Sequence, residues 1–144
     1  MLENCTQDSI QPISIDVRLA SIFSLYAKGI VDYEHMPVIK ELKLPYVLKP
    51  GEYGLARTVE KINQQSSNYG MLFFPRSRAE RIGLLIQSGV MHPFYKGEMI
   101  FGIKNIASHP IRLSHKMGVA QVCFFDIKSN CVPLQHLYSH GKVM

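Results

Sequence analysis

The chain has 144 residues, of which 47% are hydrophobic and 19% charged, and its formal net charge is +5. This length suits one domain over residues 1–144, since domains cluster near about 100–150 residues. The composition excludes a disordered chain, and no apolar stretch approaches the roughly 20 residues of a membrane-spanning helix. The start resembles no secretory signal, and three cysteines are too few for a disulfide scaffold. We therefore expect a reduced, cytoplasmic protein with no membrane contact.

Patterns of period two dominate the chain and predict β-strands. In Ile13–Leu19 apolar and polar residues alternate strictly, and Asp16 on its polar face is expected to make a structural hydrogen bond or ion pair. The apolar run Met71–Phe74 predicts a strand buried on both faces. The stretch Ala27–Leu44 has no clear period and is expected to be a loop or irregular insertion. Such short, regularly spaced strands predict an all-β sandwich or barrel. Further strands are expected at Glu52–Val59, Met99–Ile103, Ile111–Leu113 and Val119–Phe125.

One segment is predicted to be helical. Ser77-Arg78-Ala79-Glu80 matches the capping box, in which serine and glutamate side chains bond free N–H groups at a helix start. The apolar stretch Ile82–Ile86 would continue this helix, although Gly83 weakens it. Three arginines crowd the start of this helix, where the helix dipole is positive. A bound anion would relieve this unfavourable crowding of cations. The alternative is that the arginines form surface ion pairs. These arginines are Arg76, Arg78 and Arg81.

Five segments, in order along the chain, resemble the dUTPase/dCTP deaminase family. The first is most similar to the dCTP deaminase branch, and the last resembles a glycine-to-glutamine motif that both branches share. The resemblance implies a distorted, jelly-roll-like β-barrel with one short helix, the dUTPase-like fold. It also implies a homotrimer with nucleotide sites between subunits. The five segments are Ile10–Leu19, Leu48–Tyr53, Pro75–Leu84, Gly89–Glu98 and Lys116–Phe124.

The resemblance also implies how the phosphates of a deoxypyrimidine triphosphate would be bound. Arg76, Ser77 and Gln121 would contact them, with Arg78 at the position of a family serine. Arginine suits this role because its guanidinium binds phosphate in bidentate fashion. A Mg²⁺ ion would be held by the phosphate oxygens, since Mg²⁺ commonly uses substrate oxygens and water.

The base and the sugar would be held by a second segment. The resemblance implies a hairpin in which backbone groups from Gly89 and Val90 onward bind the pyrimidine, with Tyr95 against the deoxyribose. Arg81 corresponds to an arginine near the site in the deaminase branch.

Two positions depart from the family's catalytic residues. His92 stands where dUTPases carry a water-activating aspartate, and Gly102 stands where dCTP deaminases carry a glutamate. Glycine cannot move a proton, so deamination is not expected. A neutral imidazole is a competent base near neutral pH, and His92 would then activate water for pyrophosphate hydrolysis. The alternative is a structural His92 bonded to the backbone, so the sequence leaves open whether the chain is an enzyme.

Two functions follow as hypotheses. In the first, a trimer binds dUTP or dCTP with Mg²⁺ and hydrolyses it to the monophosphate and pyrophosphate. In the second, a catalytically inactive relative binds a nucleotide or a protein and regulates or sequesters it. A nucleic-acid binder is a weaker alternative, because the interleaved aromatic residues of a stacking platform are lacking. No metal site made of protein ligands is expected, since no cysteine pair has the spacing of a zinc deaminase.

Overall fold

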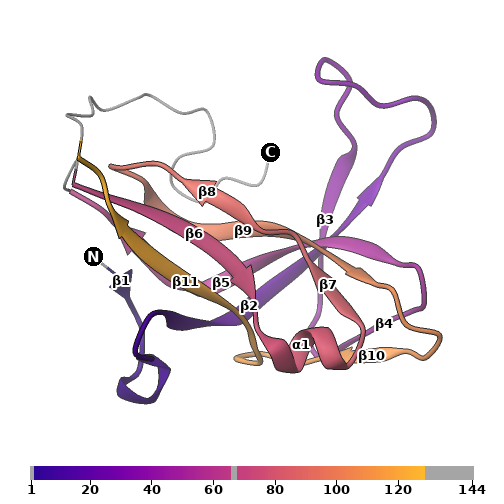
Figure 1. The fold of residues 1–144 in the computed structure, drawn as a ribbon. Helices are drawn as coiled ribbons and strands as arrows, with labels where there is room; N and C mark the ends of the chain where they lie inside the picture. Colours follow the sequence, from indigo (N-terminus) through magenta and orange to yellow (C-terminus); the bar gives the residue numbers. More distant parts are fainter. Residues whose placement is uncertain (1, 66–67, 129–144) are drawn as a thin grey trace.

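The computed structural model describes residues 2–65 and 68–128, which form an antiparallel nine-stranded sheet, a two-stranded sheet and two short helices (Figure 1). The predicted all-β class with one short α-helix is confirmed. Within the described ranges, no helix is long and apolar enough to cross a membrane. The helices are η1 (Gln7–Ser9, 3-10) and α1 (Ser77–Arg81). The strands are β1 (Leu2–Glu3), β2 (Ile15–Tyr26), β3 (Val38–Leu42), β4 (Tyr46–Leu48), β5 (Tyr53–Asn63), β6 (Tyr69–Pro75), β7 (Leu84–Ile86), β8 (Gly89–Met91), β9 (Lys96–Asn105), β10 (Ile111–Leu113) and β11 (Gly118–Asp126).

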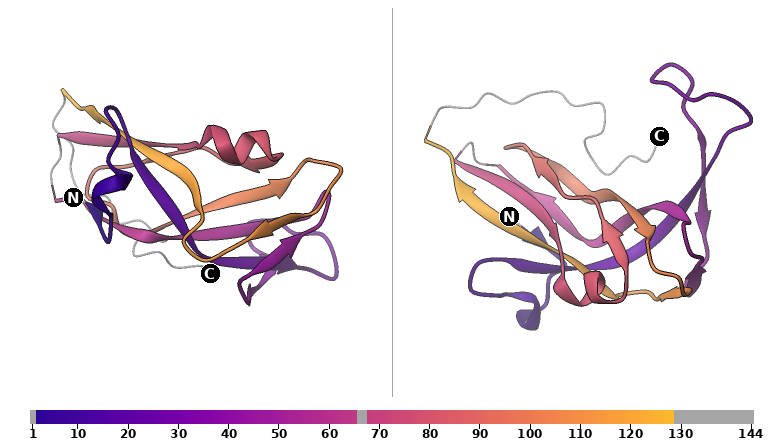
Figure 2. Two further views of the ribbon diagram at one scale, coloured as in Figure 1. Left: turned by 90° about the horizontal axis from the view of Figure 1, so that it is seen from below. Right: turned by 45° about the vertical axis from the view of Figure 1, so that its right-hand side comes forward.

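The large sheet curls on itself into a half-barrel. Its strand order is β7-β9-β5-β2-β11-β6-β8, with β1 added to β5 and β3 added to β2. Phe73 on β6 and Phe101 on β9 lie on strands that are not paired, yet their ring centroids are 4.5 Å apart. The two ends of the sheet therefore approach each other across the core, as Figure 2 shows.

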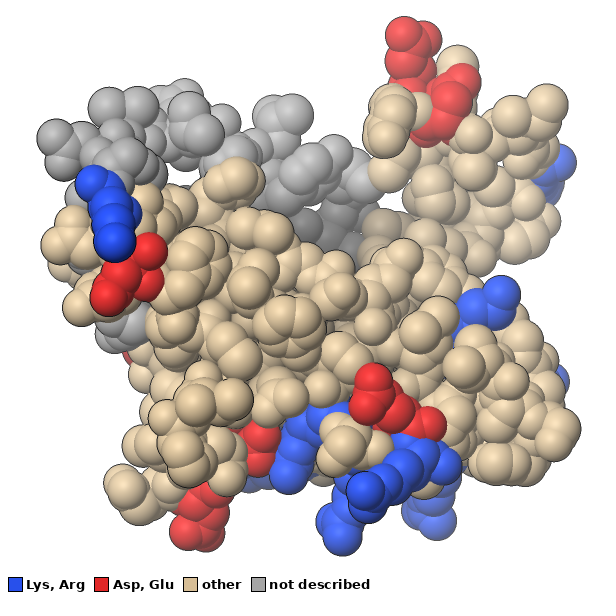
Figure 3. All heavy atoms as spheres, in the orientation of Figure 1, with Lys and Arg blue, Asp and Glu red and all other residues tan. Residues whose placement is uncertain are grey.

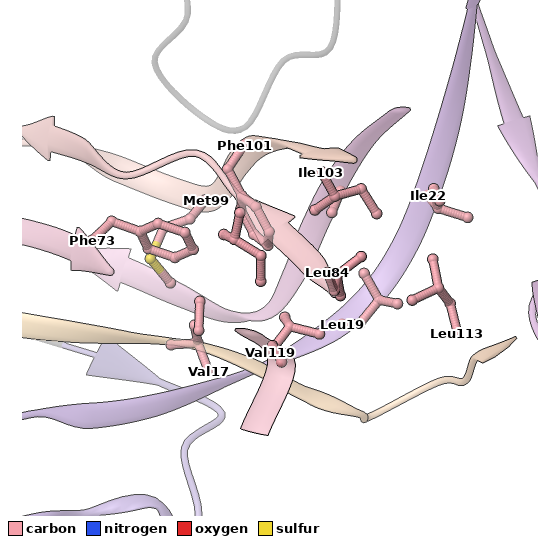
Figure 4. Close-up of a cluster of buried hydrophobic side chains, with 14 of the residues drawn as sticks. Val17, Leu19, Ile22, Phe73, Leu84, Met99, Phe101, Ile103, Leu113 and Val119 are labelled. Atoms are coloured by element: carbon pink, nitrogen blue, oxygen red, sulfur yellow. The ribbon is translucent and has the colours of Figure 1, made fainter. Parts of the chain in front are cut away.

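Apolar side chains from both ends of the sheet fill the inside of this half-barrel (Figure 4). The alternation predicted for the first strand is confirmed at Val17 and Leu19, which are both fully buried. The strand begins later than expected, because Ile13 lies before β2 and is 82% exposed. In β6 the strand is confirmed but burial on both faces is wrong, since Phe74 points outward and is 38% exposed.

The stretch Ala27–Leu44 contains a strand that the sequence analysis missed. Residues 38–42 form β3 and pair with the end of β2, because the long β2 continues past the residues that pair with β11 and β5. Residues 27–37 between them have no regular structure and project from the sheet (Figure 1). Ile30 and Tyr33 in this projection are 95% and 99% exposed.

The predicted helix is confirmed, but its boundaries and its cap are wrong. Arg76, not Ser77, takes the N-cap position, and no side chain bonds the free N–H groups there. Gly83 adopts a φ of +81°, which favours glycine, and this ends the helical region. Leu84 and Ile86 are buried on either side of exposed Leu85, so this apolar run has a strand's period and forms β7.

The predicted hairpin over Gly89–Tyr95 is also wrong. β8 pairs with β6, whereas β9 pairs with β5 and β7, so β8 and β9 do not pair with each other. The connection is a turn in which Tyr95 N donates to His92 O at 3.3 Å. This segment therefore crosses from one end of the curled sheet to the other, and it encloses a hollow between them.

Candidate functional site

An apolar hollow of about 340 Å³ lies where the two ends of the sheet approach each other. Backbone and apolar side chains dominate its walls, and among its lining residues there is no carboxylate, imidazole or thiol. Its lining therefore suits a flat, uncharged group. The residues are Leu55, Phe73, Gln87, Ser88, Gly89, Val90, Met91, Tyr95, Met99, Ile100, Phe101 and Gly102.

Tyr95 is fixed at the wall of the apolar hollow. Its hydroxyl donates to the carbonyl oxygen of Glu98 at 2.7 Å. Burial, together with the nearby Glu98 carboxylate, raises the pKa of Tyr95 above its usual value of 10.0. The phenol thus stays protonated at neutral pH and offers a ring face and a fixed edge to whatever enters the hollow.

The amide of Gln87 fills the place that a side chain at position 102 would take. A Cβ built on Gly102 would clash with Gln87 Oε1 and lie 2.5 Å from the Tyr53 hydroxyl. That hydroxyl donates to Gln87 Oε1 at 3.3 Å, and the backbone N–H of Gln87 donates to the Gly102 carbonyl at 2.9 Å. The position where the family resemblance implies a glutamate is therefore bare backbone covered by a neutral amide.

A second, polar hollow of about 410 Å³ lies beside the start of α1. Arg76 Nη2 is 3.1 Å from Asp16 Oδ2, which confirms the ion pair or hydrogen bond expected of Asp16. Gln121 accepts a hydrogen bond from Ser14 Oγ at 2.9 Å and donates to the Pro75 carbonyl at 3.3 Å. The complete lining is Gln11, Ile13, Ser14, Asp16, Pro75, Arg76, Ser77, Glu80 and Gln121.

The polar hollow brings together the three residues that sequence analysis assigned to phosphates. Arg76, Ser77 and Gln121 come from the start of α1 and from β11, and all three line it. Arg78 and Arg81 do not line it; both are exposed in the last turn of α1. Figure 3 shows Lys and Arg gathered at the end of the molecule where α1 lies in Figure 1, with acidic residues among them.

The apolar hollow brings together the residues assigned to the base and the sugar. Gly89, Val90 and Tyr95 line it. His92 is exposed and is not among the lining residues, although its neighbour Met91 is. The two hollows share no residue.

The sequence analysis missed Gln87, which lines the apolar hollow, and Tyr53, which bonds the Gln87 side chain. One signal points to them: Gly102 stands inside an apolar strand, where a glycine marks the close approach of another group. Among the described residues, no three His, Cys, Asp or Glu side chains are grouped as a metal site would require.

Comparisons with known proteins found similar sequences and similar folds. Residues 1–127 match the family model described as dCTP deaminase-like. The "dCTP deaminase, dUMP-forming" of Bifidobacterium adolescentis is 30% identical over 149 residues, covering 95% of this chain and 75% of that protein.

Solved structures share the fold. The 2'-deoxycytidine 5'-triphosphate deaminase of Agrobacterium tumefaciens has a TM-score of 0.68 at 17% identity, over 85% of this chain and 43% of that one. The chain therefore spans less than half the length of that deaminase. The EIAV dUTPase has a TM-score of 0.61 at 18% identity, over 99% of this chain and 100% of that one.

Proposed function

Since this chain belongs to the dCTP deaminase-like family, we propose that it binds a deoxypyrimidine triphosphate without converting the base. The apolar hollow takes the base and the sugar, and the polar hollow takes the phosphates. One observation carries this assignment: Arg76, Ser77 and Gln121 line one hollow, whereas Gly89, Val90 and Tyr95 line the other. A guanidinium, a hydroxyl and an amide are groups that bind phosphate oxygens.

The polar hollow also fits a Mg²⁺ ion carried by the phosphates. Its lining includes the carboxylates of Asp16 and Glu80, and Mg²⁺ is commonly held by one or two carboxylates together with phosphate oxygens and water. When bound, the ion would neutralise part of the triphosphate charge. The protein's own part is to hold the phosphates with Arg76 and Ser77.

We propose that the two hollows meet between copies of the chain, in the homotrimer that the family resemblance implies. On one copy the two hollows have no lining residue in common. Apolar side chains exposed near them, such as Phe74 and Val90 at 38% and 62%, would be covered by such an assembly. Light scattering should then give three times the chain mass, and a monomer would contradict this arrangement.

The absence of deamination rests on the wall of the apolar hollow. Deamination needs a group that moves protons at the base, and general acid–base catalysis requires such a group within hydrogen-bond reach. The lining offers Gly102 and the neutral amide of Gln87 at the corresponding place, and none of its residues carries a carboxylate. The chain would therefore act as a nucleotide-binding module that sequesters or senses its ligand.

Hydrolysis to the monophosphate and pyrophosphate, with water activated by His92, is the second candidate. One observation favours it: His92 is exposed in the turn that directly follows β8, whose Met91 lines the apolar hollow. An exposed imidazole there would reach a water near a bound nucleotide in the trimer.

A single set of assays separates the two candidates. The chain is incubated with dUTP or dCTP and Mg²⁺, pyrophosphate and ammonia are followed, and binding is measured by calorimetry. We expect saturable binding without release of either product. Pyrophosphate release that His92→Ala abolishes and His109→Ala leaves intact would establish hydrolysis instead. His109 is a suitable control because it is exposed and lines neither hollow. Release of ammonia from dCTP, or failure to bind either nucleotide, would contradict the proposal.

A further inference from the structure

The side-chain amide of Gln87 has one end engaged and one end available. Its Oε1 accepts a hydrogen bond from the Tyr53 hydroxyl and lies over the bare backbone of Gly102. Among the described residues, its Nε2 has no hydrogen-bond partner. Because the two ends of an amide point about 120° apart, Nε2 is directed away from Gly102.

The backbone fixes where this amide stands. The Gln87 N–H bonds the Gly102 carbonyl at 2.9 Å, and the preceding Ile86 pairs with Ile103 in the sheet. The next residues along the chain, Ser88 to Met91, form one wall of the apolar hollow, and Gln87 itself is part of the lining. The backbone of Gln87 is therefore fixed at the edge of the hollow, and its exposed side chain is held there by the hydrogen bond from the Tyr53 hydroxyl.

We infer that Gln87 Nε2 reads the 4-position of the bound pyrimidine and selects a carbonyl there over an amino group. This inference rests on the proposed function, since it assigns a role within the same hollow. A primary amide nitrogen is a donor of two hydrogen bonds and accepts none. It bonds the O4 of uracil or thymine, but against the N4 amino group of cytosine it sets donor against donor. The ligand class is thus a 4-oxo deoxypyrimidine triphosphate.

Tyr53 is the positioning residue in this arrangement. Its hydroxyl engages Oε1, the acceptor end of the amide, and so keeps that end from the ligand. With Oε1 free, the amide could turn over and present its oxygen to an amino group. Gly102 contributes by having no side chain where Oε1 lies.

The test measures binding of dUTP and dCTP by calorimetry with Mg²⁺, on the full chain and on variants. The parent chain should bind dUTP at least about tenfold more tightly than dCTP, because Nε2 would gain a hydrogen bond to O4 of uracil and would face the N4 amino group of cytosine donor to donor. Gln87→Glu has nearly the same shape but accepts hydrogen bonds, so it should reverse the preference toward dCTP. Tyr53→Phe should narrow the preference without abolishing binding.

Gln7→Glu is the matched control, since it makes the same change at an exposed glutamine that lines neither hollow. It should leave the ratio of the two affinities unchanged. Equal binding of dUTP and dCTP by the parent chain would overturn this inference and leave the proposed function standing. A folded Gln87→Glu variant, verified by circular dichroism, that keeps the preference for dUTP would do the same. Failure of the parent chain to bind any deoxypyrimidine triphosphate would overturn both.

Discussion

The guanidinium of Arg76 is held by the carboxylate of Asp16, with Nη2 and Oδ2 3.1 Å apart, at the wall of the polar hollow. The Asp16 side chain is only 11% exposed, whereas the Arg76 side chain is 37% exposed. The carboxylate therefore fixes the arginine from the protein side, and the rest of the guanidinium remains available to a ligand. A fixed guanidinium loses less conformational entropy when it binds phosphate than a free one.

Replacing this arginine should weaken triphosphate binding. Arg76→Ala removes charge-assisted hydrogen bonds worth about 1.5–3 kcal/mol, which corresponds to a roughly tenfold to hundredfold loss of affinity. Calorimetry with dUTP measures the loss. Arg112→Ala is the matched control, since Arg112 is exposed on β10 and lines neither hollow. Equal effects of the two substitutions would show that net charge, and not this site, attracts the nucleotide.

The buried carboxylate of Glu60 should be a major determinant of stability. Glu60 is fully buried, and its carboxylate accepts two hydrogen bonds from Arg18. The backbone N–H donates one at 2.7 Å and Nε donates the other at 2.6 Å. Arg18→Met leaves this carboxylate without its cation, at a cost of about 3–5 kcal/mol. Urea unfolding measures the change in the free energy of unfolding.

The ion pair of Lys61 and Glu98 provides the comparison. Its atoms are 3.1 Å apart, and its side chains are 46% and 25% exposed. Lys61→Met should therefore cost no more than about 1 kcal/mol. A loss from Arg18→Met as small as this would contradict the role given to Glu60.

Two buried glycines on paired strands should respond differently to alanine. A Cβ on Gly54 would lie 2.7 Å from the backbone oxygen of Phe23, which cannot move without shifting β2. Gly54→Ala should therefore cost about 1–3 kcal/mol. On Gly102 the Cβ would meet the ends of the Gln87 and Tyr53 side chains, which can swing away. Gly102→Ala should cost less than about 1 kcal/mol in thermal or urea unfolding. A larger loss of stability from Gly102→Ala than from Gly54→Ala would mean that the ends of the Gln87 and Tyr53 side chains cannot move aside.

Tyr95 should make stability fall at alkaline pH. Burial and the Glu98 carboxylate raise its pKa in the folded chain above 10.0. The contribution of Tyr95 to the free energy of unfolding is thus complete below its pKa in the unfolded chain. It is lost as the pH rises through its pKa in the folded chain. Tyr95→Phe should lower stability by about 1 kcal/mol at neutral pH through the lost hydrogen bond. It should also flatten the decline above about pH 10. Urea unfolding across this range checks both effects, and an unchanged slope would contradict the assignment.

The sequence predicted β2, β5, β6, β9, β10 and β11, because their residues alternate or form short apolar runs between turn residues. It missed the strands β1, β3, β4 and β7. It was least accurate where one short pattern fits two structures. Ile82–Ile86 has apolar residues that suit a helix, but the left-handed φ of Gly83 ends the helix and leaves Leu84 and Ile86 to form β7. The predicted capping box was also wrong, because the five-residue helix Ser77–Arg81 has Arg76 as its N-cap and no side-chain cap.

Of the candidate site, the sequence identified residues that carry charge or lie in a recognisable motif. Arg76, Ser77 and Gln121 were found in this way and lie together. Gln87 was not, because its importance comes from the pairing that sets it over Gly102, and that pairing joins residues far apart in the chain. The predicted hairpin failed similarly, since which strand β8 pairs with depends on how the sheet curls.

The separation of the two hollows has a consequence for mixtures of defective chains. A copy that carries Arg76→Ala keeps its apolar hollow intact, and a copy that carries Gln87→Ala keeps its polar hollow, since no residue is common to both. Where sites form between neighbours, a mixed trimer of the two variants would contain sites in which the intact apolar hollow of one copy meets the intact polar hollow of the other. Neither variant alone can form such a site. Damage in one subunit would thereby be complemented by the next.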